Sequence, residues 1–413
     1  MKNSSPKTKM AFIGACLASA LLLSACSGDE PADNGGGTDS GVTPVIELTA
    51  EANEAAAAVR DFNIDFFRNV ALADDYKGKS VACSPLSANM LLCMLSNAAS
   101  DETAAEIASV LGYSGTDELN ELYATLATKL PSLDPKAQLA FANSVWYEQE
   151  FTLTPTFSNI AQEYYKADIF RRDMTGKSPN VKEEINSWVN NKTRGLISDI
   201  KVPFPVYTTL INATYFKAAW KNAFKAENTK KAAFHGQGGD SQIDMMNREG
   251  GYMYERTADY EAVELPFGAG AFNATFILPS GDIEELIESD ALKGLWSYDP
   301  GAQNIDISLP RFKIAEDEEL KLTGILCDMG VKSLVKPGKL NLFIESPEAE
   351  SISVCQKTSV EFNEQGAEAA AVTWAMGEIS AGYITVTFDR PFIFLITEKS
   401  TNSILFAGKI MDL

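Results

Sequence analysis

The chain has 413 residues, of which 45% are apolar and 22% are charged, and its mean hydropathy is −0.09. This composition is that of a globular protein with enough apolar material for a core, and it excludes a wholly disordered chain. The formal net charge of −21 argues against nucleic acid and anionic lipid as partners, because both require clustered Lys and Arg.

Residues 1–25 have the features of an export signal. Three lysines precede an apolar run over residues 10–23, which is shorter than the roughly 20 apolar residues that cross a bilayer. The sequence "LSAC", which ends at Cys26, resembles the bacterial lipoprotein box. That resemblance implies cleavage before Cys26 and lipidation of its thiol, and a plain secretory peptide is the alternative.

Residues 26–47 are small, acidic and rich in Gly and Pro, so we expect a flexible tether between the lipid and the folded domain. The acidic run after Cys26 resembles surface-export signals of some Gram-negative lipoproteins. This implies a chain that is lipid-anchored to the outer membrane and exposed on the surface, with periplasmic retention as the alternative. The remaining cysteines lie in apolar contexts without a CxxC spacing, which favours buried free thiols; they are Cys83, Cys93, Cys327 and Cys355.

No second linker or repeat follows, so residues 48–413 are expected to form one domain. Helical patterns come first, over 49–73, 84–99 and 101–112. Runs of β-branched and aromatic residues bounded by Gly, Pro or Asp then follow at 137–149, 208–220, 261–279, 303–314, 359–363, 383–398 and 403–410. The order predicts an α+β fold with its helices early and its strands late.

The stretch "EFNEQGAEAAAVTWAMGEISAGY", residues 361–383, matches neither an ordinary loop nor a core strand. Every odd position from 367 to 377 is small, while the even positions carry all the bulky and charged residues of that run. As a strand, the segment could pack one face against a core with little steric cost. An Ala-rich amphipathic helix is the alternative, which Val372, Thr373 and Gly377 disfavour.

Five segments in matching order resemble the serpin family, from about residue 50 to Leu413. "NEQGAEAAAVT" is similar to the hinge of the serpin reactive-centre loop, "CSPLSANMLLCML" to the second helix, and "INATYFKAAW" to the strand that carries shutter and breach residues. "DRPFIFLI" and "ILFAGKI" resemble the buried strands after the loop. The resemblance implies about nine helices, three β-sheets and an exposed loop, at about 364–388, that can insert into the central sheet.

A serpin inhibits a protease by changing conformation, and the resemblance implies the same here. The protease forms an acyl-enzyme with the loop, and the loop then inserts as a missing strand and carries the protease to the far pole. The implied hinge residues are Glu364, Gly366, Ala367, Glu368, Ala369, Ala370, Ala371 and Thr373. The implied breach and shutter residues are Trp220, Asn212, Ser84, Ser87 and Gln356.

The family's spacing from Glu364 and from Pro391 places the scissile bond at Ser380–Ala381, and the alternatives are Ile379 and Met376. No Lys or Arg lies between positions 365 and 389, which disfavours trypsin-like targets. Small residues at the bond suit the shallow primary pocket of elastase-like or subtilisin-like serine proteases. Papain-like cysteine proteases are the alternative.

Two departures from common patterns shape the remaining expectations. Gln356 stands where many serpins have a shutter histidine; its amide could bond Asn212 but cannot titrate. The sole histidine, His235, is expected to be a packing or strand-end residue. Because a hydrolase would need it beside a nucleophile and an acid, and because no His/Cys/carboxylate cluster has ligand spacing, we expect neither an enzyme, nor a cofactor, nor a metal site.

Few basic residues lie in 116–138, so no heparin-type cofactor is expected, and the protein is expected to be a monomer. The competing hypothesis is a serpin-like lipoprotein that has lost inhibition and serves as a protease substrate, chaperone or ligand carrier.

Overall fold

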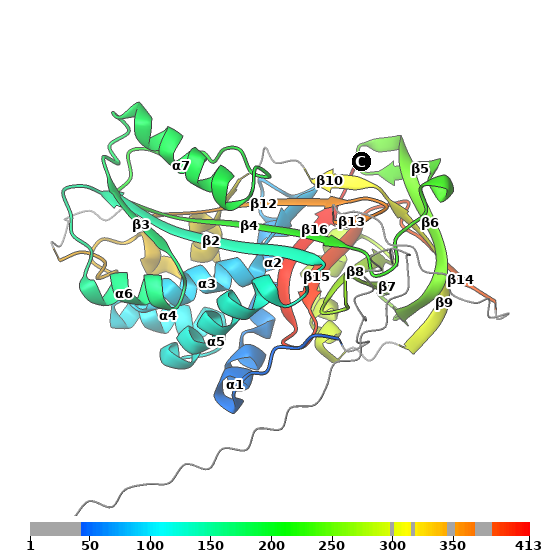
Figure 1. Ribbon diagram of the computed structural model, residues 1–413, viewed down its shortest axis with the longest axis horizontal. Coiled ribbons are helices and arrows are strands. Elements are labelled where there is room, and N and C mark those ends of the chain that lie inside the picture. Colours follow the sequence, from blue (N-terminus) through cyan, green and yellow to red (C-terminus); the bar gives the residue numbers. More distant parts are fainter. Residues whose placement is uncertain (1–42, 298–300, 315–318, 345–351, 368–381) are drawn as a thin grey trace, which may run out of the picture. The chain divides into compact units, whose positions relative to one another are not determined.

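The computed structural model describes residues 43–297, 301–314, 319–344, 352–367 and 382–413 (Figure 1). From Gly41 onward the chain forms one compact unit. Within the part that is described, no helix is long and apolar enough to cross a membrane.

Most α-helices lie in the first half of the chain, as the sequence predicts. They are α1 (Ala50–Ala58), α2 (Arg60–Leu72), α3 (Pro85–Ser96), α4 (Asp101–Leu111), α5 (Thr116–Lys129), α6 (Pro155–Glu163), α7 (Pro179–Lys192), α8 (Ile283–Glu288) and α9 (Leu322–Met329). Short 3-10 turns occupy Leu130–Ser132, Ala226–Asn228, Ala291–Ser297 and Lys332–Val335. The Ser84 hydroxyl caps α3 at Ser87 N, with Pro85 in the first turn, and Gly112 ends α4 at φ +71°, so local sequence sets these boundaries.

A seven-stranded sheet forms the middle layer. Its strands are β2 (Ala137–Glu148), β3 (Asp168–Arg172), β4 (Thr208–Ala219), β10 (Phe312–Ile314), β11 (Leu320–Lys321), β12 (Ile352–Phe362) and β13 (Gly366–Ala367). The order is β10-β12-β4-β2-β3, with β11 paired to β12 and β13 paired to β4. Helix α7 covers one face of this sheet, and α3 and α5 lie on the other side (Figure 1).

A nine-stranded sheet contains most of the C-terminal half. Its strands are β1 (Val81–Cys83), β5 (Lys230–Gly236), β6 (Gly239–Arg256), β7 (Tyr260–Pro266), β8 (Phe272–Pro279), β9 (Gly301–Pro310), β14 (Ile384–Thr387), β15 (Phe392–Glu398) and β16 (Ser403–Ile410). The α+β class is therefore confirmed. Hydrogen bonds join the described strands into two sheets rather than three, because the 18-residue β6 pairs with β7 near one end and with β5 and β9 along the rest.

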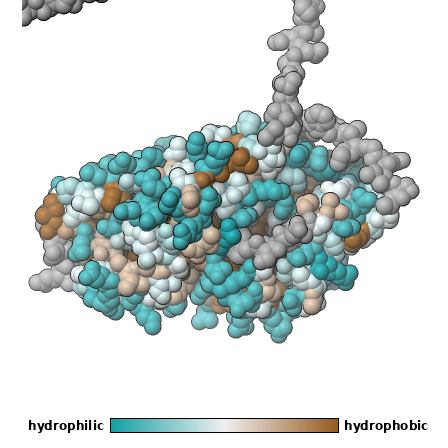
Figure 2. Space-filling view, turned by 90° about the horizontal axis from the view of Figure 1, so that it is seen from below, coloured by the Kyte–Doolittle hydropathy of each residue, from teal (hydrophilic) through white to brown (hydrophobic). Residues whose placement is uncertain are grey.

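Two apolar clusters hold the layers together. The larger fills the space between the helices α1–α5 and both sheets, and the smaller lies between α7 and the strands β2, β4 and β12. On the face drawn in Figure 2, hydrophilic residues predominate and apolar residues are scattered rather than gathered into one broad patch. This surface agrees with the composition and the acidic net charge.

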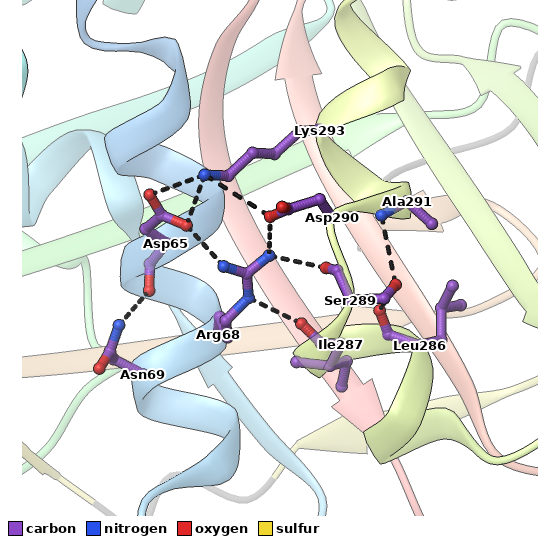
Figure 3. Close-up of polar contacts among 9 residues, drawn as sticks. All are labelled: Asp65, Arg68, Asn69, Leu286, Ile287, Ser289, Asp290, Ala291 and Lys293. Carbon is purple, nitrogen blue, oxygen red and sulfur yellow. Dashed lines mark hydrogen bonds and ion pairs between the residues drawn. The ribbon is translucent and has the colours of Figure 1, made fainter.

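Arg68 on α2 connects the helices to the segment that follows β8 (Figure 3). Its Nε and Nη2 donate to the backbone carbonyls of Ile287 (2.9 Å) and Ser289 (2.7 Å), at the end of α8. Its Nη1 donates to Asp65 (2.9 Å), which also binds Lys293 (3.1 Å). A cation at these terminal carbonyls satisfies acceptors that the short helix leaves open.

Candidate functional site

The predicted site residues in the described part gather around the seam, by which we mean the paired strands β4 and β12. These strands run parallel over eight residue pairs, from Ile352 opposite Thr208 to Ser359 opposite Tyr215. On its other edge, β4 pairs antiparallel with β2. Because β4 and β12 point the same way, a strand placed between them in the opposite direction could pair with both.

The short strand β13 already lies beside β4 at one end of the seam. Gly366 pairs with Ala219, and Ala367 with Ala218, in the antiparallel sense. Ala218 also lies opposite Ala137 of β2, so β13 must occupy the other edge of β4, which β12 uses farther along. The chain therefore leaves β12, turns, and starts back into the seam.

Gly366 makes this return possible. Its φ is +135°, in the region that favours glycine, and it exchanges backbone hydrogen bonds with Asn363 (2.9 and 3.1 Å). A Cβ at this position would lie 2.2 Å from Ala218 O and 2.6 Å from Trp220 N. Any side chain here would thus displace β13 from β4. The next residue, Ala367, is 2% exposed and packs in the larger core.

Trp220 holds the turn from beyond the end of β4. Its backbone N donates to Gln365 O (2.8 Å), and its indole Nε1 donates to Asn363 O (2.9 Å). The ring stacks on Phe267 at 4.4 Å and on Phe362 at 5.8 Å. The indole therefore combines core packing with a hydrogen bond to the chain at the entrance of the seam.

Glu364 anchors the same turn through polar contacts. Its carboxylate accepts from Thr229 Oγ1 (2.8 Å) and lies 3.7 Å from Arg311. Arg311 also contacts Asp244, whose pKa is lowered, first by a hydrogen bond from Lys231 and further by Arg311. Glu364 therefore ties the turn to the segments just before β5 and just after β9.

Gln356, in the middle of β12, binds the start of α3. Its Oε1 accepts from Ser84 N (2.7 Å), and its Nε2 donates to Ser84 O (2.9 Å). Gln356 lies directly opposite Asn212 in the seam, and both are fully buried. The bond to Asn212 suggested by the sequence is not among those found; the amide of Gln356 bonds the backbone N and O of Ser84 instead.

Buried side chains continue this network across the sheet. The Ser84 hydroxyl donates to Ser87 Oγ (2.9 Å), which lies 2.6 Å from Thr214 Oγ1. Thr214 donates to Asn212 Oδ1 (2.8 Å), and Asn212 Nδ2 donates to Asn143 Oδ1 (2.8 Å) on β2. The sequence reasoning missed Thr214 and Asn143, although Thr214 lies two residues from Asn212 and therefore on the same strand face.

On the face of the sheet away from α3, α7 and the segment after it cover the seam. Ile211 of β4 and Cys355 of β12 both pack in the smaller apolar cluster there. The buried Lys357 Nζ donates to Asp199 O (2.8 Å) and to its carboxylate (2.9 Å), and this hydrogen bond lowers the pKa of Asp199. No sequence pattern indicated this contact, which ties the segment after α7 to β12.

Several predicted residues lie outside the described part of the chain. They are the scissile-bond candidates Ser380, Ala381, Ile379 and Met376, the hinge residues Glu368, Ala369, Ala370, Ala371 and Thr373, and the lipidation candidate Cys26. After the loop, the described chain resumes at residue 382 and enters β14.

His235 lies on β5, next to the β5–β6 hairpin turn. Its Nδ1 is 2.8 Å from Asp240 Oδ1, and its backbone N donates to Asp389 O (2.7 Å). Asp240, through a hydrogen bond and its charge, raises the pKa of the imidazole. The described residues contain no group of three His, Cys, Asp or Glu that could hold a metal ion.

Comparison with known proteins gives a consistent result. The family model described as "Serpin (serine protease inhibitor)" matches residues 57–413. Iris from Ixodes ricinus is 29% identical over 372 residues, covering 86% of this chain and 98% of Iris. Among solved structures, the native thermophilic serpin tengpin has a TM-score of 0.79 at 28% identity, covering 89% of this chain and 95% of tengpin. Human thyroxine-binding globulin has a TM-score of 0.78 at 26% identity, covering 88% and 99%.

Proposed function

Because the chain belongs to the serpin family, we propose that it is an irreversible suicide-substrate inhibitor of serine endopeptidases and, through the same acyl-enzyme chemistry, of cysteine endopeptidases. The observation that carries this proposal is β13, which starts an antiparallel strand on the edge of β4 where β12 lies farther along. A strand begun there can be extended only if β4 and β12 separate.

The register of β13 indicates how the loop would fit. Continued along β4, it would place Ala371 opposite Thr214, Thr373 opposite Asn212 and Gly377 opposite Thr208. Ala367 and its partner Ala218 both face the larger core. Side chains alternate along a strand, so the odd positions up to 377 would face that core too, and all of them are small.

The proposed reaction uses the protease's own chemistry. The protease nucleophile attacks the carbonyl carbon of Ser380, the bond to the Ala381 nitrogen breaks, and this nitrogen leaves as a protonated amine. The new ester, or thioester for a cysteine protease, joins the protease to the loop. Residues from Ala381 onward stay in place, because β15 and β16 are interior strands of the nine-stranded sheet. Insertion of the loop before water attacks the ester then traps the protease.

The loop sequence favours targets with a shallow primary pocket. No Lys or Arg lies between positions 365 and 389, so a pocket with a carboxylate at its base would find no partner there. Ser380 and Ala381 are small, as elastase-like and subtilisin-like proteases prefer. Cleavage after Ile379 or Met376 is the secondary proposal.

The direct test incubates the protein with an elastase-like and with a subtilisin-like protease. We expect a complex that survives heat and detergent on a gel, and mass spectrometry of the denatured complex should find a separate fragment that begins at Ala381. Cleaved protein without any such complex would contradict inhibition and favour the role of a substrate.

Two variants at one position test the insertion step. Ala371→Arg would place a charge in the core beside Thr214, so we expect cleavage at the same bond but no stable complex. Ala371→Ser is the matched control, since a small hydroxyl suits that polar neighbourhood, and it should still inhibit. Equal inhibition by both variants would rule out the inward-facing assignment.

A non-inhibitory binding role is the second candidate, favoured by the similarity to thyroxine-binding globulin, whose name states that it binds thyroxine. This chain would then act as a carrier, a chaperone or a simple protease substrate. Such a protein would bind a partner through its body and form no detergent-stable complex with any protease.

We also propose that the mature protein is a monomer, held through lipid on Cys26 at the outer surface of a Gram-negative outer membrane. Labelling of cells with a radioactive fatty acid should mark the protein but not its Cys26→Ser variant. Protease added to intact cells should cleave it if it faces outward, and protection would place it on the periplasmic side.

A further inference from the structure

A small polar cavity lies where α2, α3 and α5 meet the turn between β15 and β16. Its volume is about 10 Å³, which is the space that one water molecule needs. Five aliphatic side chains form part of its wall: Ala56, Val59, Leu86, Leu122 and Leu126. The turn contributes Thr401, Asn402 and Ser403.

Three polar atoms around this cavity lack a hydrogen-bond partner in the described structure: Asn63 Oδ1, Asn89 Nδ2 and Tyr123 Oη. The three residues come from α2, α3 and α5, and they are 4%, 1% and 1% exposed. A buried polar atom without a partner is costly, and three around one cavity need a common explanation.

Neighbouring groups offer only one weak substitute for these missing bonds, the thiol of Cys93. Asn89 Oδ1 already accepts from Cys93 Sγ (3.5 Å), which leaves the amide nitrogen of Asn89 free to donate elsewhere. Burial raises the pKa of the Cys93 thiol, and a hydrogen-bond contact with Tyr123 only partly offsets that rise. The thiol is therefore neutral, and it is a weak partner for the phenol.

We propose that this cavity is a binding site for one ordered water molecule, which joins α2, α3 and α5. The water would donate to Asn63 Oδ1, accept from Asn89 Nδ2 and form a third hydrogen bond with Tyr123. Three partners are typical for a buried water. No charged side chain lines the cavity, and the three unpaired atoms include both a donor and an acceptor. A neutral molecule therefore fits better than an ion.

The proposed water site lies against α3, the helix whose first turn also contacts the seam. Helix α3 carries Ser84 and Ser87 at its first turn and Asn89 two residues farther on. A water bonded to Asn89 would fix this helix against α2 and α5. The inference stands on the cavity and its three unpaired atoms, and it does not depend on the proposed inhibition.

A pair of tyrosine variants tests the proposed water, because the melting temperature of Tyr123→Phe should fall if the water is present and should not fall if the cavity is dry. Tyr123→Phe removes one partner of the proposed water, and it should lower the melting temperature by roughly 1–3 °C at a fixed scan rate. In a dry cavity, the same change would remove an unsatisfied hydroxyl and leave the melting temperature unchanged or raised. A melting temperature at or above that of the unaltered protein would overturn the proposal.

Tyr165→Phe is the matched control. Its ring stacks 6.3 Å from that of Tyr123, it is equally buried, and its hydroxyl donates directly to Asn120 (2.6 Å). The Tyr165→Phe variant should be less stable than the unaltered protein whether or not the cavity holds water. Its lower melting temperature would show that the assay detects the loss of one buried hydrogen bond. A crystal structure of the intact protein should also show one density peak within hydrogen-bond distance of all three atoms, and an empty cavity would contradict the site.

Discussion

Gly366 is the residue that lets the chain turn back onto β4. Its positive φ and the contacts that a Cβ would make with Ala218 and Trp220 leave no room for a side chain. The sequence marks this position through the resemblance of its motif, but only the backbone geometry gives the reason for a glycine there.

Gly366→Ala should weaken the docking of β13 by about 1–3 kcal/mol, because it combines strain at positive φ with overlap against the backbone. Insertion of the loop would then start more slowly, and more molecules would be cleaved for each protease trapped. The stoichiometry of inhibition measures this ratio. Gly251→Ala, at a glycine with open space around it, is the control and should leave the ratio unchanged.

His235 gives a pH prediction at the same scale. Its hydrogen bond to Asp240, and that residue's charge, raise the pKa of the imidazole above its usual value near 6.5. The folded state thus binds this proton more tightly than the unfolded state. The stabilisation is complete below about pH 6.5 and is lost as pH rises through the higher folded-state pKa.

NMR titration can check this directly, because the chain contains one histidine and gives one imidazole signal. We expect a pKa above 6.5 in the folded protein and a fall toward 6.5 in Asp240→Asn. A folded-state pKa at or below 6.5 would be inconsistent with the His235–Asp240 contact.

Gln356 shows what sequence reasoning can and cannot reach for a single residue. The resemblance put it in the shutter together with Asn212, which lies opposite it, but its hydrogen bonds go to the backbone of Ser84, far away in sequence. A motif gives the identity of a residue at a position. The partner depends on how separate elements pack, and no local pattern encodes that.

At the scale of elements, the seam can be tested by joining its two strands. Ile211 lies opposite Cys355, and both side chains pack in the cluster beneath α7. In Ile211→Cys, two thiols would face each other across neighbouring strands about 4.8 Å apart, which is within the range of a disulfide.

We expect the oxidised Ile211→Cys protein to be cleaved by the target protease without forming a stable complex, since the disulfide prevents separation of the strands. Reduction of the same sample should restore inhibition, which makes the variant its own control. Full inhibition by the oxidised form would show that the strands need not part at this point.

Elements with strong local patterns were predicted well. The predicted run 261–279 contains nearly all of the two strands of the hairpin β7–β8, and the predicted run 403–410 is β16; every residue of β8 and β16 is buried. The β5–β6 hairpin and α7 were not predicted. Much of β6 is exposed or half-buried, and its sequence is polar like that of a loop. Its strand conformation therefore depends on pairing with β9 and β5 rather than on the strand preference of its own residues.

At the scale of the whole molecule, the proposed function requires a chain that has not reached its lowest free energy, and two features support this requirement. A parallel seam lies in the seven-stranded sheet, and β13, whose Ala367 is the last residue described before position 382, already pairs with β4 at the end of this seam. The same sequence carries small residues at every odd position up to 377, the pattern that a new central strand would need. The class of fold followed from the order of helices and strands, whereas the proposed insertion of the loop between β4 and β12 draws its support from the pairing of the strands.

The structure of the protein cleaved at Ser380–Ala381 tests this account most directly. We expect residues 368–377 to lie between β4 and β12, antiparallel to both, with Thr373 opposite Asn212. The distance between the Asn212 and Gln356 strands should grow from one inter-strand spacing, about 4.8 Å, to two, about 9.6 Å. A cleaved protein in which Gln356 still lies directly opposite Asn212 would contradict the account.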